Sequence, residues 1–218
     1  MAYAVKEVYA TLQGEGARTG RASVLLRFAG CNLWTGREEH RADAACRFCD
    51  TDFVGVDGPG GGKFETAAEL AAHTRAVWRA AAGEGGVPYV VCTGGEPLLQ
   101  LDASLIKALQ HVGFEVAVET NGTLDAPPEL DWICVSPKGA TPLRQRGGDE
   151  IKLVYPQAEP EAQPERFEDL AFTYFYLQPL DTGDPTLNAE HEAAVTAYCL
   201  QNPQWRLGIQ AHKRLGLK

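Results

Sequence analysis

Short apolar runs that alternate with helical stretches constrain the fold of this 218-residue sequence more than any other feature. Two stretches, residues 65–82 and 102–112, carry apolar side chains at helical spacing. Six apolar runs are typical of strands, and they cover residues 24–28, 87–92, 114–119, 132–135, 150–154 and 174–177. Nearly continuous apolar strands, several of them separated by helices, favour a parallel sheet that is covered on both faces. The sequence therefore predicts an α/β protein.

Polar or Gly-rich clusters follow directly after most of these predicted strands. They contain Cys31, Thr93 to Glu96, Asn121, Ser136 with Lys138, and Gln178. Because ligands gather at the C-terminal ends of parallel strands, we expect a binding site there. A closed eight-stranded barrel usually needs about 250 residues. We therefore predict a partial, open TIM-like β/α barrel, with a mostly parallel sheet of about six strands, in a single domain over residues 1–218.

Charge and hydropathy exclude several classes of protein. The 29 Asp and Glu residues outnumber the 20 Lys and Arg residues, and the formal net charge of -9 repels the phosphates of nucleic acids and anionic lipids. No stretch approaches the roughly 18 apolar residues of a membrane-spanning helix, and residues 1–7 lack the layout of a signal peptide. We therefore expect a cytoplasmic protein without nucleic-acid or membrane partners.

The six cysteines fall into two groups, and in a reducing compartment neither group is explained well by a disulfide framework. Three lie in apolar runs, where a free cysteine behaves as a small core residue: Cys92, Cys134 and Cys199. The other three lie in polar, loop-like sequence: Cys31, Cys46 and Cys49. We therefore expect the second group to have a chemical function.

Cys46 and Cys49 stand close enough in sequence to ligate one metal centre, and Cys31 precedes them by the long segment 32–45. Three thiolates on a [4Fe–4S] cluster leave one iron without a protein ligand and free for chemistry. Two alternatives stay open. One is a structural zinc site with His40 as fourth ligand, although such sites usually place their ligands as two close pairs. The other treats all the cysteines as core residues.

The motifs around these cysteines resemble the radical S-adenosylmethionine (SAM) superfamily. The resemblance rests on a strand that ends in cysteine, a Cys-x-aromatic-Cys motif, and a Gly-Gly-Glu-Pro turn after the next strand. That superfamily usually has three residues between the first two cysteines, so loop 31–49 is a modified cluster-binding loop. One branch, the 7-carboxy-7-deazaguanine synthase family, matches along the whole chain. The matching motifs are Leu12-Gln13-Gly14-Glu15-Gly16, Arg27 to Trp34, Cys49-Asp50-Thr51, Glu119-Thr120-Asn121-Gly122 and Gln210-Ala211-His212-Lys213.

The resemblance implies a lyase that uses a [4Fe–4S] cluster, SAM and Mg²⁺. It implies that the reduced cluster donates one electron to the sulfonium of SAM, and that the resulting 5′-deoxyadenosyl radical abstracts hydrogen from 6-carboxy-5,6,7,8-tetrahydropterin. The ring then contracts with loss of ammonia to 7-carboxy-7-deazaguanine, a step toward queuosine or other 7-deazapurines. A homodimer and a flavodoxin-like electron donor are implied in the same way.

The residues that would bind SAM follow the predicted strands. Glycines after a strand let main-chain carbonyls approach the ammonium of SAM, and Glu96 adds opposite charge. The alternative for Thr93, Gly94, Gly95 and Glu96 is a plain strand-to-helix turn with Pro97 in the first turn. Ser136 and Lys138 suit the carboxylate of SAM, although an isolated Lys is more often a solvated surface residue. Phe48 and Gln178 suit the adenosine, with Phe48 alternatively a shield for the cluster, and the resemblance adds Asp50.

Gln13, Glu15 and Arg27 offer an amide, a carboxylate and a guanidinium for a pterin-like ring that bears a carboxylate. The alternative is a structural ion pair between Glu15 and Arg27. By resemblance, the substrate also contacts Leu12, Gly14, Thr93, Asn121 and His212, and the oxygen of Thr51 binds Mg²⁺. For His212 and Lys213 the competing view is a frayed, solvated tail.

Two rival functions remain. A glycyl-radical activase would keep the cluster but usually has the short cysteine spacing, and a non-catalytic zinc-binding module would hold no iron or sulfide.

Overall fold

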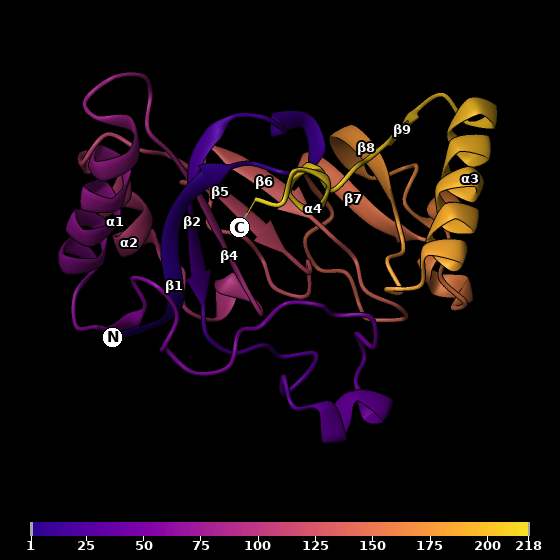
Figure 1. Ribbon diagram of the computed structural model, residues 1–218, viewed down its shortest axis with the longest axis horizontal. Coiled ribbons are helices and arrows are strands. Elements are labelled where there is room, and N and C mark those ends of the chain that lie inside the picture. The colour runs from indigo at the N-terminus through magenta and orange to yellow at the C-terminus, as the bar shows by residue number, and fades with distance from the viewer. Residues whose placement is uncertain (1, 218) are drawn as a thin grey trace.

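The computed structural model describes residues 2–217, which form one open, mostly parallel sheet with helices outside it (Figure 1). The strands are β1 (Tyr3–Leu12), β2 (Ala22–Phe28), β3 (Gly62–Phe64), β4 (Tyr89–Gly94), β5 (Glu115–Thr120), β6 (Trp132–Val135), β7 (Gly147–Tyr155), β8 (Ala171–Pro179) and β9 (Trp205–Leu207). Their order is β3-β1-β2-β4-β5-β6-β7-β8-β9. From β2 to β9 every neighbouring pair is parallel, whereas β1 pairs antiparallel with β2 and β3.

This architecture confirms the predicted α/β class, the mostly parallel sheet and the open arrangement, but the expected count of about six strands is wrong, because the described part of the chain has nine. The additional strands are β1, β3 and β9. In β1 the buried Lys6 and the charged Glu7 interrupt the apolar pattern. The strands β3 and β9 have only three residues each, which is too short for any periodicity to show.

Residues 2–217 contain four α-helices: α1 (Ala67–Ala82), α2 (Ala103–His111), α3 (Pro185–Gln201) and α4 (Ala211–Leu215). In Figure 1, α1 and α2 lie together beside β1 and β2, and α3 lies at the opposite end beside β8 and β9. Three of the helices begin with N-caps. Asp184 accepts hydrogen bonds from the second and third residues of α3, and Thr66 and Asp102 each accept one from the third residue of α1 and of α2. Helices α1 and α2 agree with the predicted segments to within two residues.

Two apolar cores lie between the sheet and these helices. The first packs α1 and α2 on the strands β1 to β5, and the second packs α3 on β6 to β9. Each fully buried Leu, Ile or Phe of these cores contributes about 1.5–3 kcal/mol to the free energy of unfolding. Cys92 and Cys134 are buried, and Cys199 packs half-buried on the second core, as the sequence predicts.

Alternation along the strands gives the inner, concave face of the sheet a different character. In β5, Val116 and Val118 belong to the first core, so Ala117 and Glu119 face the other way. In β7, Ile151 and Leu153 belong to the second core, so Glu150 and Lys152 face inward. The sheet thereby places charged side chains inside its own curve. No helix within residues 2–217 has the length and hydropathy needed to cross a membrane.

Candidate active site

A cavity of about 280 Å³ opens at the C-terminal ends of the parallel strands. It is bounded by the turn after β1, by the cysteine loop and by the ends of β4 to β8. The predicted site residues in its lining are Leu12, Gln13, Gly14, Glu15, Arg27, Cys31, Cys46, Phe48, Cys49, Asp50, Thr51, Thr93, Gly94, Gly95, Asn121, Ser136, Lys138, Gln178 and His212. Glu96 and Lys213, which the resemblance placed with His212 on the substrate side, are not among the described residues that line it. The structure brings the lining residues together, and what each of them binds stays a prediction.

The three cysteines of the polar group share one wall of the cavity. Cys31 follows the end of β2 and accepts a hydrogen bond from the amide of Leu33, with 3.4 Å between N and Sγ. Burial raises the pKa of Cys31. A hydrogen bond from Cys46 lowers the pKa of Cys49 to about 6, and the same hydrogen bond raises the pKa of Cys46. The side chains of Cys46 and Cys49 therefore lie within hydrogen-bond distance of each other.

The long segment between Cys31 and Cys46 is folded around a small core of its own. Trp34, Ala44 and Phe53 are buried together, and the rings of Trp34 and Phe53 meet edge to face with centroids 5.7 Å apart. Cys31 and Cys49 pack on this core. The 3₁₀ helix η2 (Glu38–Asp43) lies on its outer side. In Figure 1 this segment, in purple, extends below the sheet.

Arg41 ties the segment to the second pair of cysteines. Its Nη1 donates to the carbonyl oxygens of Arg47, at 2.8 Å, and Cys49, at 3.0 Å, while Glu38 holds its Nε. The guanidinium also lies 4.2 Å from the ring centroid of Trp34. These contacts explain how a fourteen-residue interval, read from the sequence, still brings the cysteines to one wall.

The donor atoms fit a cluster of several irons better than a single zinc ion. Within residues 2–217 no group of three or more His, Cys, Asp or Glu side chains stands close enough to hold one metal ion. The thiolates of a [4Fe–4S] cluster each bind a different iron and need not crowd around one point. His40, the fourth ligand of the zinc alternative, is exposed, contacts Thr35 at 2.9 Å and is not among the described residues that line the cavity.

The turn after β4 depends on its two glycines. A Cβ on Gly94 would lie 2.4 Å from the carbonyl oxygen of Phe28, and one on Gly95 would lie 2.2 Å from that of Gly30. The Gly94 φ of 143° also disfavours any other residue. Only glycine therefore lets this turn approach the chain that leads to Cys31. The backbone amide of Glu96 completes the contact by donating to the Gly30 carbonyl at 3.0 Å.

Glu96 caps the short helix η3 (Pro97–Leu99), as the strand-to-helix alternative predicts. Its buried carboxylate accepts hydrogen bonds from the amide of Leu98 at 2.9 Å, from the hydroxyl of Thr120 at 2.8 Å and from the amide of Asn121 at 2.8 Å. Burial raises the pKa of Glu96 although these donors lower it. Glu96 thus joins the turn after β4 to the end of β5, behind the cavity wall.

Gln178 at the end of β8 presents an unused acceptor. Its Oε1 is buried and has no hydrogen-bond partner in the part of the chain that the structure describes. Buried amide oxygens are normally paired, so this one points to a ligand that donates to it. On the neighbouring wall, Lys138 Nζ donates to Ser136 Oγ at 2.5 Å and lies 5.9 Å from the ring centroid of Phe48.

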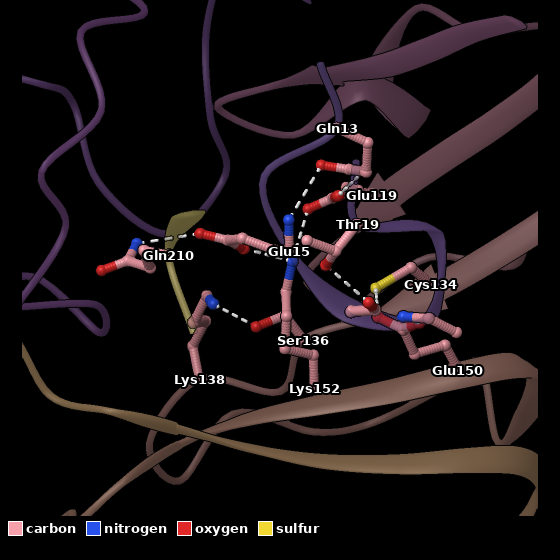
Figure 2. A network of polar contacts seen from close by, with 12 residues as sticks. Gln13, Glu15, Thr19, Glu119, Cys134, Ser136, Lys138, Glu150, Lys152 and Gln210 are labelled. Atoms are coloured by element: carbon pink, nitrogen blue, oxygen red, sulfur yellow. Dashed lines mark hydrogen bonds and ion pairs between the residues drawn. The ribbon is translucent and has the colours of Figure 1, made fainter. Parts of the chain in front are cut away.

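The cavity lining also includes a buried network around Lys152 (Figure 2). Lys152 Nζ donates to Glu15 at 2.5 Å and to Glu119 at 2.8 Å. The second oxygen of Glu119 accepts from Gln13, and that of Glu15 accepts from Gln210, both at 2.8 Å. Burial alone would raise the pKa of Glu15, but Lys152 is the main cause that lowers it to about 2.

Sequence reasoning missed Lys152 and Glu150 and quoted Glu119 and Gln210 only within motifs. Lys152 stands between two buried apolar residues of a strand, which is the signal that could have identified it. Glu150 faces inward two residues earlier and accepts a hydrogen bond from the amide of Ala17 at 2.7 Å. Burial raises the pKa of Glu150. The same carboxylate lies where a Cβ on Gly16 would fall, and the Gly16 φ of 68° is left-handed.

The structure corrects two alternatives drawn from the sequence. Glu15 and Arg27 do not pair with each other, because Arg27 Nε donates to Glu7, its register partner across β1 and β2, at 2.8 Å. The C-terminal segment is not a frayed tail. The amide of Ala211 donates to the Gly14 carbonyl at 2.9 Å, and a Cβ on Gly14 would lie 2.3 Å from Nδ1 of His212.

Lys213 spans the rim of the site rather than lining it. Its Nζ donates to Asp50 at 2.7 Å and to Asp181 at 2.6 Å, so it connects the cysteine loop with the segment after β8. Asn121 contributes a second link to the cysteine loop, because its amide donates to Asn32 at 3.0 Å. Thr51 lies in the lining next to Asp50, half-buried.

Comparisons with known proteins agree along the whole chain. The model of the radical SAM superfamily matches residues 41–134. The 7-carboxy-7-deazaguanine synthases of Bordetella pertussis and Bradyrhizobium diazoefficiens are each 59% identical to this chain over 218 residues, which is 100% of both chains in each case. The crystal structure of QueE from Escherichia coli has a TM-score of 0.68 and 25% identity, and it covers 97% of this chain and 95% of that one.

Proposed function

The chain belongs to the 7-carboxy-7-deazaguanine synthase family, and from this premise we propose that its cavity converts 6-carboxy-5,6,7,8-tetrahydropterin to 7-carboxy-7-deazaguanine with loss of ammonia. Membership makes it a radical SAM enzyme of 7-deazapurine biosynthesis, with a [4Fe–4S] cluster and SAM as cofactors. The observation that carries the proposal is the single cavity that has the three cysteines on one wall and the amide–carboxylate–lysine network on another.

The cysteine end of the cavity suits the cofactors. Cys31, Cys46 and Cys49 would hold the [4Fe–4S] cluster, which when bound and reduced would supply the electron for cleavage of SAM. The unpaired Gln178 oxygen would accept a hydrogen bond from the adenosine, and Lys138 with Ser136 would bind the carboxylate of SAM. The carbonyls of the turn at 93–95 would accept from its ammonium, with Phe48 and Asp50 completing the wall.

Glu96 supports the same subsite from behind. Because its carboxylate is used by Leu98, Thr120 and Asn121, it acts by holding the turn and by adding negative charge near the ammonium. In this role the Glu96 carboxylate attracts the ammonium of SAM without a direct hydrogen bond to it. Glu96→Gln should therefore weaken SAM binding less than loss of Lys138 does.

Another part of the cavity lining suits a ring with N–H donors and a carboxylate. Gln13 and Glu15 supply acceptors, and Arg27 supplies donors for a carboxylate even though Glu7 already holds its Nε. Further contacts are assigned to Leu12, Gly14, Thr93, Asn121 and His212. Thr51 would provide one oxygen for Mg²⁺, an ion that keeps several waters and needs few protein ligands.

We further propose a lyase that works as a cytoplasmic homodimer and receives its electrons from a flavodoxin-like protein. The resemblance to the synthase family supports the dimer and the donor, and the acidic net charge of -9 supports the absence of nucleic acid from its partners.

The test is anaerobic incubation of the iron–sulfur enzyme with the carboxytetrahydropterin, SAM, Mg²⁺ and a reductant. We expect 7-carboxy-7-deazaguanine, ammonia and 5′-deoxyadenosine by mass spectrometry. An activase that makes a glycyl radical on a partner protein would leave the pterin unchanged. A zinc-binding module would be purified colourless, with zinc and no sulfide.

The ligand assignment is tested separately by iron and sulfide content. Cys31→Ala, Cys46→Ala and Cys49→Ala should each lower the cluster content strongly. Cys199→Ala is the matched control, because Cys199 is a half-buried free thiol on the second core, and it should keep the wild-type content. Wild-type iron content in any of the first three variants would refute that ligand.

A further inference from the structure

Lys152 lies where a lysine is costly to place. It is in the middle of β7, its side chain is only 5% exposed, and its neighbours Ile151 and Leu153 belong to an apolar core. An ammonium group in such a place must be paired to be tolerated. Lys152 is paired twice, and it also lines the cavity. The site therefore includes a buried cation to which the proposed function has given no role.

The two partners of Lys152 come from different parts of the chain, and each is held a second time. Glu15 follows β1 and receives a hydrogen bond from Gln210, while Glu119 belongs to β5 and receives one from Gln13. The result is a row of amide, carboxylate, ammonium, carboxylate and amide that is visible in Figure 2. Each carboxylate is thereby fixed through both of its oxygens, and neither is left to rotate.

Resting on the proposed function, we propose that Lys152 is a positioning residue, which fixes the Glu15 and Glu119 carboxylates as the acceptors for the N–H groups of the ring substrate. Without this cation the negative charges of the Glu15 and Glu119 carboxylates would repel each other, because no ammonium group would stand between them. One or both would turn away, and the acceptor pattern in this part of the cavity would be lost. Glu150 lies two residues earlier on the same face, and burial raises its pKa.

Lys152 and the expected cluster ligands belong to different parts of the cavity lining. Lys152 belongs to β7 and to the network around Glu15, whereas the cluster ligands belong to loop 31–49. Loss of Lys152 should therefore leave the cluster and the cleavage of SAM intact, while the substrate is held weakly and out of register. The radical would then often be quenched elsewhere, and 5′-deoxyadenosine would accumulate without product.

The experiment compares the reconstituted holoenzyme with Lys152→Gln, and Lys6→Gln serves as matched control. Lys6 is another buried lysine between two carboxylates, but the cavity lining does not include it. We expect Lys152→Gln to raise the KM for the carboxytetrahydropterin at least tenfold and the ratio of 5′-deoxyadenosine to product severalfold. The electron paramagnetic resonance spectrum of the reduced cluster should not change. Lys6→Gln should keep the KM and the ratio even if it is less stable.

A second variant carries the test should Lys152→Gln fail to fold. Gln210→Ala removes the hydrogen bond to the other oxygen of Glu15 without touching the buried cation. It should raise the KM in the same direction by a smaller factor. Wild-type KM and ratio in Lys152→Gln, or in Gln210→Ala where the first variant does not fold, would overturn the inference. So would an equal rise in Lys6→Gln. A wild-type enzyme that leaves the pterin unchanged overturns the proposed function itself, and with it this role of Lys152.

Discussion

Lys6 and Lys152 show how the same pairing serves two purposes in one sheet. Both side chains are almost fully buried, 10% and 5% exposed, and each ammonium contacts two carboxylates. The carboxylates differ. Asp52 and Asp57 around Lys6 are 71% and 82% exposed, whereas the two glutamates around Lys152 are 15% and 23% exposed. The burial of the anions therefore distinguishes a cation that holds a surface loop, Lys6, from one that lines the cavity, Lys152.

The two lysines are expected to contribute differently to stability because their carboxylate partners differ in exposure to solvent. The aspartates around Lys6 stay hydrated whether or not the lysine is present, so the pairing is screened and contributes little. Lys6 also donates to the carbonyl oxygen of Val54 at 2.8 Å, which fixes the loop after the cysteines to β1. The glutamates around Lys152 have lost most of their water. Removing their cation leaves charges that nothing else in the network neutralises.

The largest effect is expected for Lys152→Met. Removal of one partner from a buried ion pair costs about 3–5 kcal/mol, so the free energy of unfolding at neutral pH should fall by that order. Anaerobic urea unfolding followed by circular dichroism measures it. A loss below about 1 kcal/mol, the range of exposed pairs, would erase the distinction between the two lysines.

A smaller effect is expected for Gly16→Ala. The left-handed φ of 68° would strain an alanine, at a cost of about 1–3 kcal/mol, and the new Cβ would meet the Glu150 carboxylate. Gly20→Ala is the control, because Gly20 has a φ of 86° but open space around its Cβ. Urea unfolding of both variants should show a greater loss for Gly16→Ala. Equal losses of stability in the two variants would mean that the Glu150 side chain can move away from the new Cβ at no cost.

Lys6→Met should have a still smaller effect. Its aspartates are exposed and remain solvated, so we expect the thermal midpoint to fall by less than about 4 °C. Thermal unfolding followed by circular dichroism is the measurement. A decrease as large as that of Lys152→Met would show that the hydrogen bond to Val54 matters more than the burial of the anions.

The smallest effect is a difference in pH dependence. The pKa of Glu15 is lowered from 4.5 to about 2 in the folded protein, so its contribution to stability is present above pH 4.5 and is lost as the pH falls toward 2. Without Lys152, burial raises this pKa, and ionised Glu15 destabilises the variant until it is protonated. The stability gap between wild type and Lys152→Met is therefore widest at neutral pH and closes as the pH falls.

The comparison with Lys6 makes this prediction specific. Lys6 lowers the pKa of Asp52 from 3.8, and an exposed aspartate returns to its ordinary value when the lysine is lost. The gap for Lys6→Met should begin to close only below about pH 4, whereas the gap for Lys152→Met should begin to close at a higher pH. The other ionisable side chains near Glu15, namely those of Glu119, Glu150 and His212, are present in both variants. Unfolding in urea at several pH values between 7 and 4 measures both gaps, and coincident curves would contradict the assignment.

Much of the fold could be predicted from the sequence because buried parallel strands leave continuous apolar runs. The runs at 132–135 and 114–119 coincide with strands to within one residue. The strand β1 was missed because it is an antiparallel strand whose alternation is disturbed by the buried Lys6. The helix α3 was not delimited, since Val195 is the one residue described as buried within it and its apolar face is weak.

The sequence could predict which residues gather at the strand ends, but it could not predict which charged side chains form ion pairs there. Polar residues directly after parallel strands must gather at one edge, and this rule brought Thr93, Ser136 and Gln178 to a single cavity. Which charge meets which other charge depends on register and curvature. For this reason the sequence did not show that Arg27 pairs with Glu7 and not with Glu15. In the same way, Lys152 was visible only as one charged residue within an apolar strand, and its two glutamate partners were not.

The contact between Gln210 and Glu15 joins residues 195 positions apart, and it has a consequence for how the protein is made. Long-range closures of this kind are slow and come late in folding. During synthesis the far wall of the cavity lacks this contact until Gln210 has left the ribosome. A nascent chain can therefore complete this wall of the cavity only after residue 210 has been synthesised and has left the ribosome.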